Sequence, residues 1–201
     1  MDTNDDLYRA ALLLHGHTCP AMPMGLRAGL AALDALGVER AADGQLAALV
    51  ETDEDHCATC YADGIQMATG CTFGKGNIHK LGYGKFAVTV IDRPSGRSVR
   101  VVTRPETMQK SKESAFIAHR KKGTPASHID PAVAKPLVDE MLRAPTEELF
   151  SIGEVYSVTL PPMRAHDFNT ITCTDCGEVT VERYVRVRDG RLVCITCAAK
   201  A

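Results

Sequence analysis

The segment HGHTCP, residues 15–20, follows the apolar run Leu12-Leu13-Leu14 and separates two stretches that are predicted to be helical. The first predicted helix covers residues 5–14, with Thr3 or Asn4 as its N-cap and acidic residues in its first turn. Pro20 prevents this helix from continuing. The second predicted helix covers residues 24–36, and Gly37 ends it. HGHTCP therefore places two histidines and a cysteine between two helices.

The remaining pattern mixes strands and helices without a regular alternation. A short helix over 59–69 is expected to end at Gly70, and Pro161-Pro162 marks a boundary. Neighbouring strands joined by the turn 93–96 favour an α+β fold over a doubly wound parallel sheet. We predict strands over 45–52, 86–91, 98–102 and 153–160, and further helices over 106–121 and 131–142. The basic residues 120–122 are expected to form a solvated helix end.

Length and composition describe an ordinary globular protein. The 201 residues suffice for one substantial core plus a small appendage, with 45% hydrophobic and 24% charged residues. A net charge of −2 argues against nucleic acid as a partner. No apolar run reaches the length of a membrane span, and an acidic start before a short apolar run is the reverse of a secretory signal. We therefore expect a cytoplasmic protein without membrane contact.

The eight cysteines fall into two sets. In a reducing compartment, cysteines at this density are expected to be metal ligands or redox groups rather than disulfides. No cysteine lies between residues 71 and 173, so two separate sites are predicted. The first set is Cys19, Cys57, Cys60 and Cys71, and the second is Cys173, Cys176, Cys194 and Cys197.

The C-terminal set has the spacing of a structural zinc site. Two C-x2-C knuckles are separated by seventeen residues (177–193), and Asp189-Gly190 predicts a hairpin turn between them. Four thiolates fill a tetrahedral shell, so zinc here is expected to be structural and to supply folding energy to a four-cysteine zinc-ribbon or treble-clef-like domain over residues 165–201. Redox pairs are the alternative. Arginines at 183, 186, 188 and 191 suit either nucleic-acid binding or, as we prefer, a solvated docking face.

The N-terminal set predicts a site of a different kind. His17 and Cys19 are two residues apart, and Cys57-x-x-Cys60 could supply further ligands from another segment. Histidine and cysteine ligands gathered from separate segments can leave a coordination position open, as catalytic sites do. Buried cysteines that act as small hydrophobic side chains are the alternative. Arg27 is expected to pair with the acidic run 53–55.

Two segments carry a resemblance to a known family. HGHTCPAMPMGLRAG (residues 15–29), ADGIQMATGCTFGKGNIHKLGYGK (residues 62–85) and the four-cysteine ribbon resemble the FmdE family, whose members are related to a component of molybdenum or tungsten formylmethanofuran dehydrogenase. The resemblance implies an N-terminal α+β domain over residues 1–160, a small zinc-binding C-terminal domain and a homodimer. It also implies a metal cleft at His17, Cys19 and Cys60, three residues before Asp63. Cys57 departs from the family pattern, so its role as ligand or resolving thiol stays open.

The resemblance says less about activity. It implies that dehydrogenase chemistry belongs to other components of the enzyme, which carry molybdopterin and iron–sulfur centres, and that some members stand alone. The glycine-rich stretch 70–76 does not match a nucleotide-binding P-loop, because the spacing is one residue short and Gly76 follows Lys75. Lys75 could hold an anion in the cleft, or the glycines could only permit close packing.

The first hypothesis is a metalloprotein that binds zinc or iron through His17, Cys19 and Cys60, with Cys57 as a further ligand. His15 or Asp63 would orient the ligands, and Cys71 and Lys75 would lie in the cleft. No catalytic residue is assigned, and whether the protein is an enzyme stays open. The alternatives are a metal or molybdenum-cofactor carrier, an accessory to a molybdopterin oxidoreductase, a thiol redox protein that uses Cys57 and Cys60, and a regulator that acts through the basic ribbon.

Overall fold

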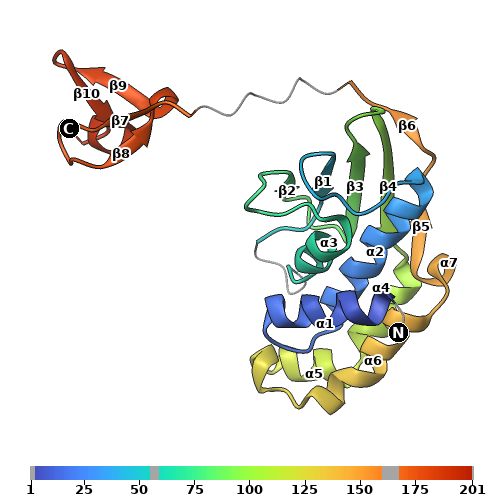
Figure 1. The fold of residues 1–201 in the computed structure, drawn as a ribbon. Coiled ribbons are helices and arrows are strands. Elements are labelled where there is room, and N and C mark those ends of the chain that lie inside the picture. Colours follow the sequence, from blue (N-terminus) through green and yellow to red (C-terminus); the bar gives the residue numbers. More distant parts are fainter. Residues whose placement is uncertain (1–2, 55–58, 160–167, 201) are drawn as a thin grey trace. The chain divides into compact units, whose positions relative to one another are not determined.

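The computed structural model describes residues 3–54, 59–159 and 168–200 (Figure 1). The chain divides into two compact units, residues 1–160 and 161–201. Pro161-Pro162, where we predicted a boundary, lies outside the described residues. Within the described ranges, no helix combines the length and the apolar character that crossing a bilayer requires.

A mixed sheet forms the framework of the first unit. Its strands run in the order β2-β1-β3-β4-β5, and β6 also pairs with β4. β1 and β2 are parallel, whereas the other pairs are antiparallel, with Ala48 opposite Val90 and Val90 opposite Val99. The strands are β1 (Leu46–Val50), β2 (Ile78–Lys80), β3 (Ala87–Asp92), β4 (Arg97–Thr103), β5 (Phe150–Ile152) and β6 (Tyr156–Ser157).

Helices complete the first unit, and α2 is the central one. Nearly all of its residues are buried, and it joins one core with β1, β3 and β4. α1, α5 and α6 gather at one end of the unit (Figure 1), around a second apolar cluster that includes Phe116 and Val138. The helices are α1 (Thr3–His15), α2 (Ala21–Leu36), α3 (Tyr61–Thr69), α4 (Pro105–Glu113), α5 (Ala115–Lys121), α6 (Pro131–Arg143) and α7 (Thr146–Leu149).

α2 and α3 cross with their backbones in contact. A Cβ atom on Gly25 would lie 1.9 Å from the carbonyl oxygen of Tyr61, and one on Gly64 would lie 2.0 Å from the carbonyl oxygen of Met22. Neither position has room for any side chain larger than hydrogen. This contact brings the start of α3 against the start of α2, which is where the cysteine motifs lie.

The α+β prediction is confirmed, and several boundaries differ. α2 begins at Ala21 rather than at residue 24, because Pro20 itself has helical dihedrals and Pro23 lies in the first turn, where a missing N–H costs nothing. The helix predicted over 106–121 breaks at Ser114, which is extended and caps α5 by accepting a hydrogen bond from the Ile117 N–H. Of the strand predicted over 153–160, only the short β6 forms in the described residues, and β5 precedes that range.

The structure assigns Arg27 a role different from the expected ion pair. Its buried guanidinium donates hydrogen bonds to the carbonyl oxygens of Met141 (3.2 Å), Leu142 (2.7 Å) and Ala144 (2.9 Å) and to the hydroxyl of Thr146 (3.1 Å). The carbonyls at the end of a helix have no partner within the helix. Arg27 therefore caps the C-terminal end of α6 and ties it to α2.

The second unit is a knuckle, a hairpin and a short helix. Asp189 and Gly190 have left-handed dihedrals, so the predicted hairpin turn is confirmed between β9 and β10. Among the described residues, its buried core is Cys173, Val193, Cys194 and Cys197. So small a core cannot stabilise a fold without a further cross-link. The elements are β7 (Thr170–Thr172), β8 (Val179–Val181), β9 (Val185–Arg188), β10 (Arg191–Cys194) and α8 (Ile195–Ala198).

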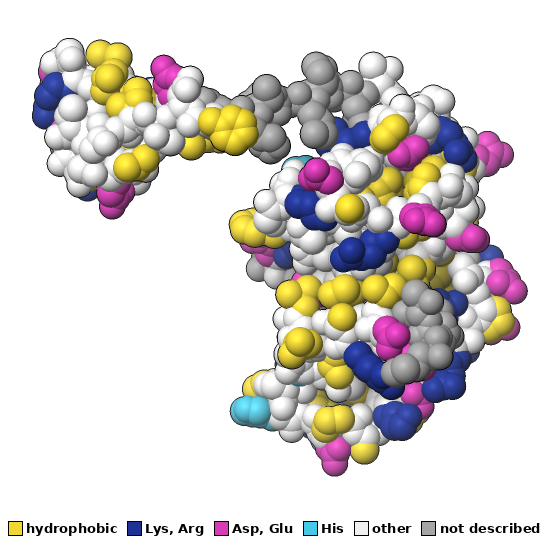
Figure 2. Space-filling model, in the orientation of Figure 1, with side chains coloured by type: hydrophobic (Ala, Val, Ile, Leu, Met, Phe, Trp, Pro, Cys, Tyr) yellow, Lys and Arg dark blue, Asp and Glu magenta, His cyan; other side chains and the backbone are white. Residues whose placement is uncertain are grey.

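Charge on the visible surface is mixed. Lys and Arg side chains are interspersed with Asp and Glu side chains over the first unit (Figure 2). In the second unit, Arg188 and Arg191 both donate hydrogen bonds to the carboxylate of Asp175. Arg186 donates a hydrogen bond of 2.9 Å to the carbonyl oxygen of Val185, and Arg183 lies over the Tyr184 ring. All four arginines considered for nucleic-acid binding are therefore engaged within the unit.

Candidate metal centre

Four donor side chains converge in the first unit. His15 ends α1, His17 and Cys19 follow in the turn before α2, and Cys60 directly precedes α3. One nitrogen or sulfur atom of each lies within 4.8 Å of the others. His15 Nε2 lies 3.2 Å from His17 Nε2 and 3.4 Å from Cys19 Sγ. The α2–α3 crossing is what joins Cys60 to the other three.

His15 is oriented by a carboxylate. Its Nδ1 lies 2.8 Å from Asp63 Oδ2, so its Nε2 faces His17 and Cys19. A histidine ligand commonly donates its second ring N–H to a carboxylate, which fixes the ring and raises its basicity. The sequence suggested His15 or Asp63 as the orienting group. In the structure Asp63 occupies the outer position and His15 lies among the donors.

The donors polarise one another. The hydrogen bond from the Cys19 thiol lowers the pKa of Cys60, and the same interaction together with burial raises the pKa of Cys19. Hydrogen bonds to Asp63 and Cys60 raise the pKa of His15 to about 9. Burial and the nearby positive charges of His15 and Arg120 lower the pKa of His17. The arrangement favours a thiolate at Cys60 and a neutral ring at His17, which are the forms that bind metals. His15 and Cys19, whose pKa values are raised, would release their protons when a metal binds.

The donor set fits a tetrahedral transition-metal site. Bonds of 2.0–2.3 Å to nitrogen and sulfur place neighbouring donor atoms about 3.3–3.8 Å apart. The distances of 3.2 and 3.4 Å between His15 and its neighbours are close to that range, and all four donors lie within 4.8 Å. Small side-chain adjustments would bring two nitrogens and two sulfurs around one ion.

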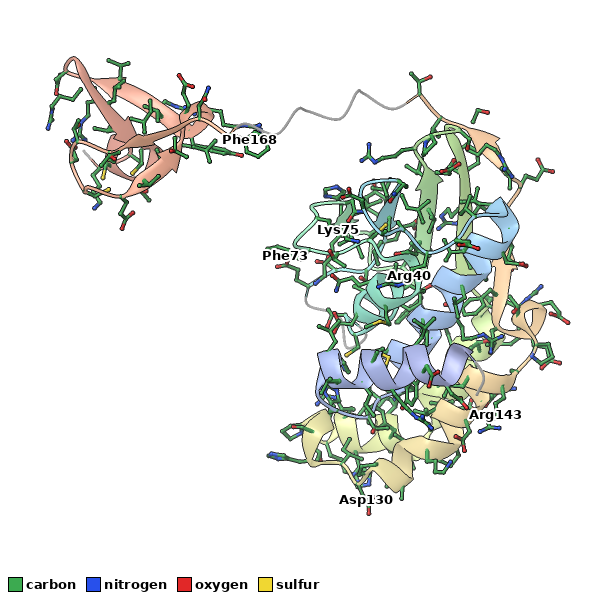
Figure 3. All side chains as sticks on the ribbon, viewed as in Figure 1. Arg40, Phe73, Lys75, Asp130, Arg143 and Phe168 are labelled. Carbon is green, nitrogen blue, oxygen red and sulfur yellow. The ribbon has the colours of Figure 1, made fainter. Side chains whose placement is uncertain are left out.

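Two other residues considered for this site, Cys71 and Lys75, lie elsewhere. Cys57 is outside the described residues. Cys71 is fully buried in the main core, and burial raises its pKa. Lys75 and Phe73 project from the glycine-rich loop (Figure 3), and Lys75 Nζ donates a hydrogen bond to the carbonyl oxygen of Ala42. The structure brings neither Cys71 nor Lys75 to the donor cluster.

Thr59 and Cys60 line two of the cavities that lie beside the donors. The first, of about 650 Å³, is bounded by His17 and Cys19 on one side and by α4 and α5 on the other. The second, of about 570 Å³, is lined by His15, Asp63 and His79. The walls of the first cavity were not predicted from the sequence. The basic run 120–122 was the one local signal of these walls. Arg120 and Lys121 line the cavity, while Lys121 and Lys122 are exposed, as expected of a solvated helix end.

The C-terminal cysteines form the second cluster. One sulfur from each of Cys173, Cys176, Cys194 and Cys197 lies within 4.8 Å of the others. Backbone N–H groups of Cys194 and Cys176 lower the pKa of Cys173 to about 6, whereas the neighbouring Cys194 thiol raises the pKa of Cys197. The cluster joins the β7–β8 knuckle to the start of α8, so a bound ion would cross-link the unit.

These features define a two-unit α+β protein with two clusters that could each hold a metal ion. The chain belongs to the FmdE family. Residues 14–151 match the family model described as "FmdE, Molybdenum formylmethanofuran dehydrogenase operon". The match spans both segments that carried the resemblance and ends before the cysteine-rich second unit.

Two similar proteins extend the comparison. A probable S-adenosyl-L-methionine-binding protein of Archaeoglobus fulgidus is 34% identical over 199 residues, covering 92% of this chain and 50% of that protein. This chain therefore spans about half the length of that relative. The crystal structure of a tungsten formylmethanofuran dehydrogenase FmdE-like protein from Syntrophus aciditrophicus has a TM-score of 0.59 at 21% identity, covering 98% of this chain and 93% of that chain. This likeness shows a shared fold.

Proposed function

We propose that this FmdE-like protein binds a transition metal, zinc or iron, at His15, His17, Cys19 and Cys60 and presents it to a small-molecule ligand. One observation carries the proposal: three of the four donors, His17, Cys19 and Cys60, also line a cavity. A purely structural site is closed on all sides, whereas a metal that acts on a ligand needs an approach. Cys57 remains a further candidate ligand from outside the described residues.

The chain's residues would have distinct roles. Cys60 and His17 would supply ligands in their metal-binding forms, and Asp63 would hold His15 in place through Nδ1. Because four protein donors fill a tetrahedral shell, action on a ligand would require a fifth coordination position or the release of one donor. The metal could then polarise a carbonyl-like C1 group or activate water. In the second unit, zinc at Cys173, Cys176, Cys194 and Cys197 would be structural. Residues 1–160 and 165–201 would form separate domains.

The physiological setting that we propose follows from the family. The family description refers to a formylmethanofuran dehydrogenase operon, which supports an accessory role beside a molybdenum or tungsten enzyme. We further propose a cytoplasmic homodimer. S-adenosylmethionine binding, which the name of the Archaeoglobus relative describes, is not carried over, because this chain spans only half of that protein.

Elemental analysis tests the first-unit site. We expect about two metal equivalents per chain, one at each cluster. Cys19→Ala should lower this by about one equivalent, because it removes one of the four donors of the first cluster. Cys71→Ala is the matched control, since Cys71 is a buried cysteine of the same unit that lies outside the donor cluster. An unchanged metal content in Cys19→Ala would remove Cys19 as an essential ligand.

A second candidate function is thiol redox chemistry. The observation that favours it is the lowered pKa of Cys60 beside the Cys19 thiol, because a thiolate is the reactive form. Titration of the chelated protein with a thiol oxidant, followed by peptide mapping, distinguishes the candidates. The redox function would be favoured if one disulfide that includes Cys60 forms rapidly both in the chelated protein and in the protein with bound metal. Protection of Cys60 by bound metal would favour the metal site.

A further inference from the structure

The first cavity has walls of two kinds. Its apolar wall is formed by Met24, Phe86, Met108, Phe116 and Ile117, which come from α2, the segment before β3, α4 and α5. Its volume of about 650 Å³ is within the range of small-molecule binding sites. The cavity therefore suits a ligand with an apolar body rather than a hydrated ion alone.

Apart from the donor Cys60, the charged side chains that line this cavity are all basic. Lys112 on α4 and Arg120 and Lys121 on α5 line it, and the described lining residues include neither aspartate nor glutamate. Arg120 is held in place by a hydrogen bond of 2.8 Å from its Nη1 to the carbonyl oxygen of Thr124. A positively charged wall favours an anion and disfavours a cation of the same shape.

We propose that the cavity binds a small organic anion, whose apolar body packs against the Met/Phe/Ile wall and whose negative group is held by the basic side chains of α4 and α5. The inference deepens the proposed function and rests on it. With its negative group at α4 and α5, the ligand would direct its other end toward the metal donors His17, Cys19 and Cys60. Burial of a carboxylate is costly unless cationic donors receive it, and this wall supplies them. The substrate class is thus an organic acid rather than a neutral or cationic compound.

Three probes with one eight-carbon chain test the proposal. Octanoate, 1-octanol and octylammonium would be titrated calorimetrically into the full-length protein, metal-loaded and after chelation. Octanoate should bind at least about tenfold more tightly than octanol, because charge-assisted hydrogen bonds are about twice as strong as neutral ones. Octylammonium should bind most weakly. Ile117→Trp, which fills the cavity, should weaken all three while metal content stays unchanged.

Matched lysine variants locate the anion. Lys112→Gln and Lys121→Gln should each weaken octanoate binding several-fold without changing octanol binding. Lys122→Gln, at an exposed lysine next in the chain that is not in the cavity lining, should leave both unchanged. Equal binding of octanoate and octanol would overturn the inference. So would a preference for octanoate that chelation abolishes and the lysine variants leave intact, since the metal would then be holding the carboxylate.

Metal analysis of the same preparations separates the two proposals. Protein that carries metal in the first unit but shows no preference for octanoate would overturn the anion site and leave the proposed function standing. A preference for octanoate in protein whose first unit takes up no metal would support the anion site and overturn the proposed function.

Discussion

At the residue scale, the Asp63–His15 pair has the most direct consequence. Asp63 holds the second ring nitrogen of His15 at 2.8 Å and thereby aims the first at the donor cluster. Asp63→Asn removes the charge but keeps the shape. Loss of an outer-shell carboxylate typically weakens metal affinity about 10- to 100-fold. We expect that loss for the first-unit metal, measured by chelator competition.

The control for this prediction is Asp43→Asn, an exposed aspartate of the same unit outside the cluster. It should leave the metal affinities of the first-unit and second-unit clusters unchanged. A first-unit affinity in Asp63→Asn equal to that of the wild type would show that His15 is not a ligand or needs no orienting group.

At the element scale, the α2–α3 crossing determines whether the site forms. Gly25→Ala would place a Cβ atom 1.9 Å from a backbone oxygen, and overpacking typically costs about 1–3 kcal/mol. We expect Gly25→Ala to lower the free energy of unfolding of the first unit and to lose the first-unit metal, measured by urea denaturation and elemental analysis. Gly74→Ala, whose Cβ would meet nothing within 4 Å, should do neither.

The sheet contains one ion pair with a pH signature. Arg100 on β4 donates two hydrogen bonds, of 2.5 and 2.8 Å, to buried Glu51 at the end of β1, and the first cause of the lowered pKa of Glu51 is this interaction. A depressed carboxylate pKa contributes stability above the ordinary value of about 4.5 and loses it as the pH falls through the folded-state value. The Glu51→Gln protein should therefore be less stable at pH 7 by about 1–2 kcal/mol, since Arg100 is partly screened by solvent.

Denaturant titrations at pH 7 and near pH 3 check this prediction. The difference between wild type and Glu51→Gln should shrink at the lower pH. If the difference in the free energy of unfolding is the same at both pH values, ionisation of Glu51 does not contribute to stability.

At the whole-molecule scale, the two units should respond differently to metal removal. The second unit buries little besides its cysteines, so we expect its fold to depend on a metal bound at the cluster. We expect Cys194→Ala to remove one metal equivalent and to abolish hydrogen-exchange protection over residues 170–198. Protection of β3 and β4, in the core of the first unit, should persist. Retained protection of β9 and β10 in the variant would contradict a metal-dependent second unit.

Local sequence patterns predicted the parts of the fold that depend on local geometry. Gly70 ends α3 with a left-handed dihedral as expected, and the hairpin at Asp189-Gly190 formed as expected. The break between α4 and α5 was not predicted, because the serine that makes it is also compatible with a continuous helix.

The site was only partly accessible from the sequence, for a related reason. The position of His15 among the donors depends on Asp63, 48 residues away. The cavity forms only when α4 and α5 pack against Phe86 and against the turn before α2 that contains His17 and Cys19. Long-range packing of this kind leaves no periodic pattern in the chain, so spacing could suggest the donor types but not the cavity beside them.

The glycine contact between α2 and α3 has a consequence for selectivity among metals. Peptide groups rather than side chains touch there, so α2 and α3 cannot approach each other further. The crossing therefore fixes the distance between the backbones of Cys19 and Cys60, which precede these two helices. An ion of different radius must then be accommodated by rotation of the donor side chains alone. Discrimination between ions of similar charge would therefore originate in the rigid backbone contact between α2 and α3, rather than in the ligand atoms themselves.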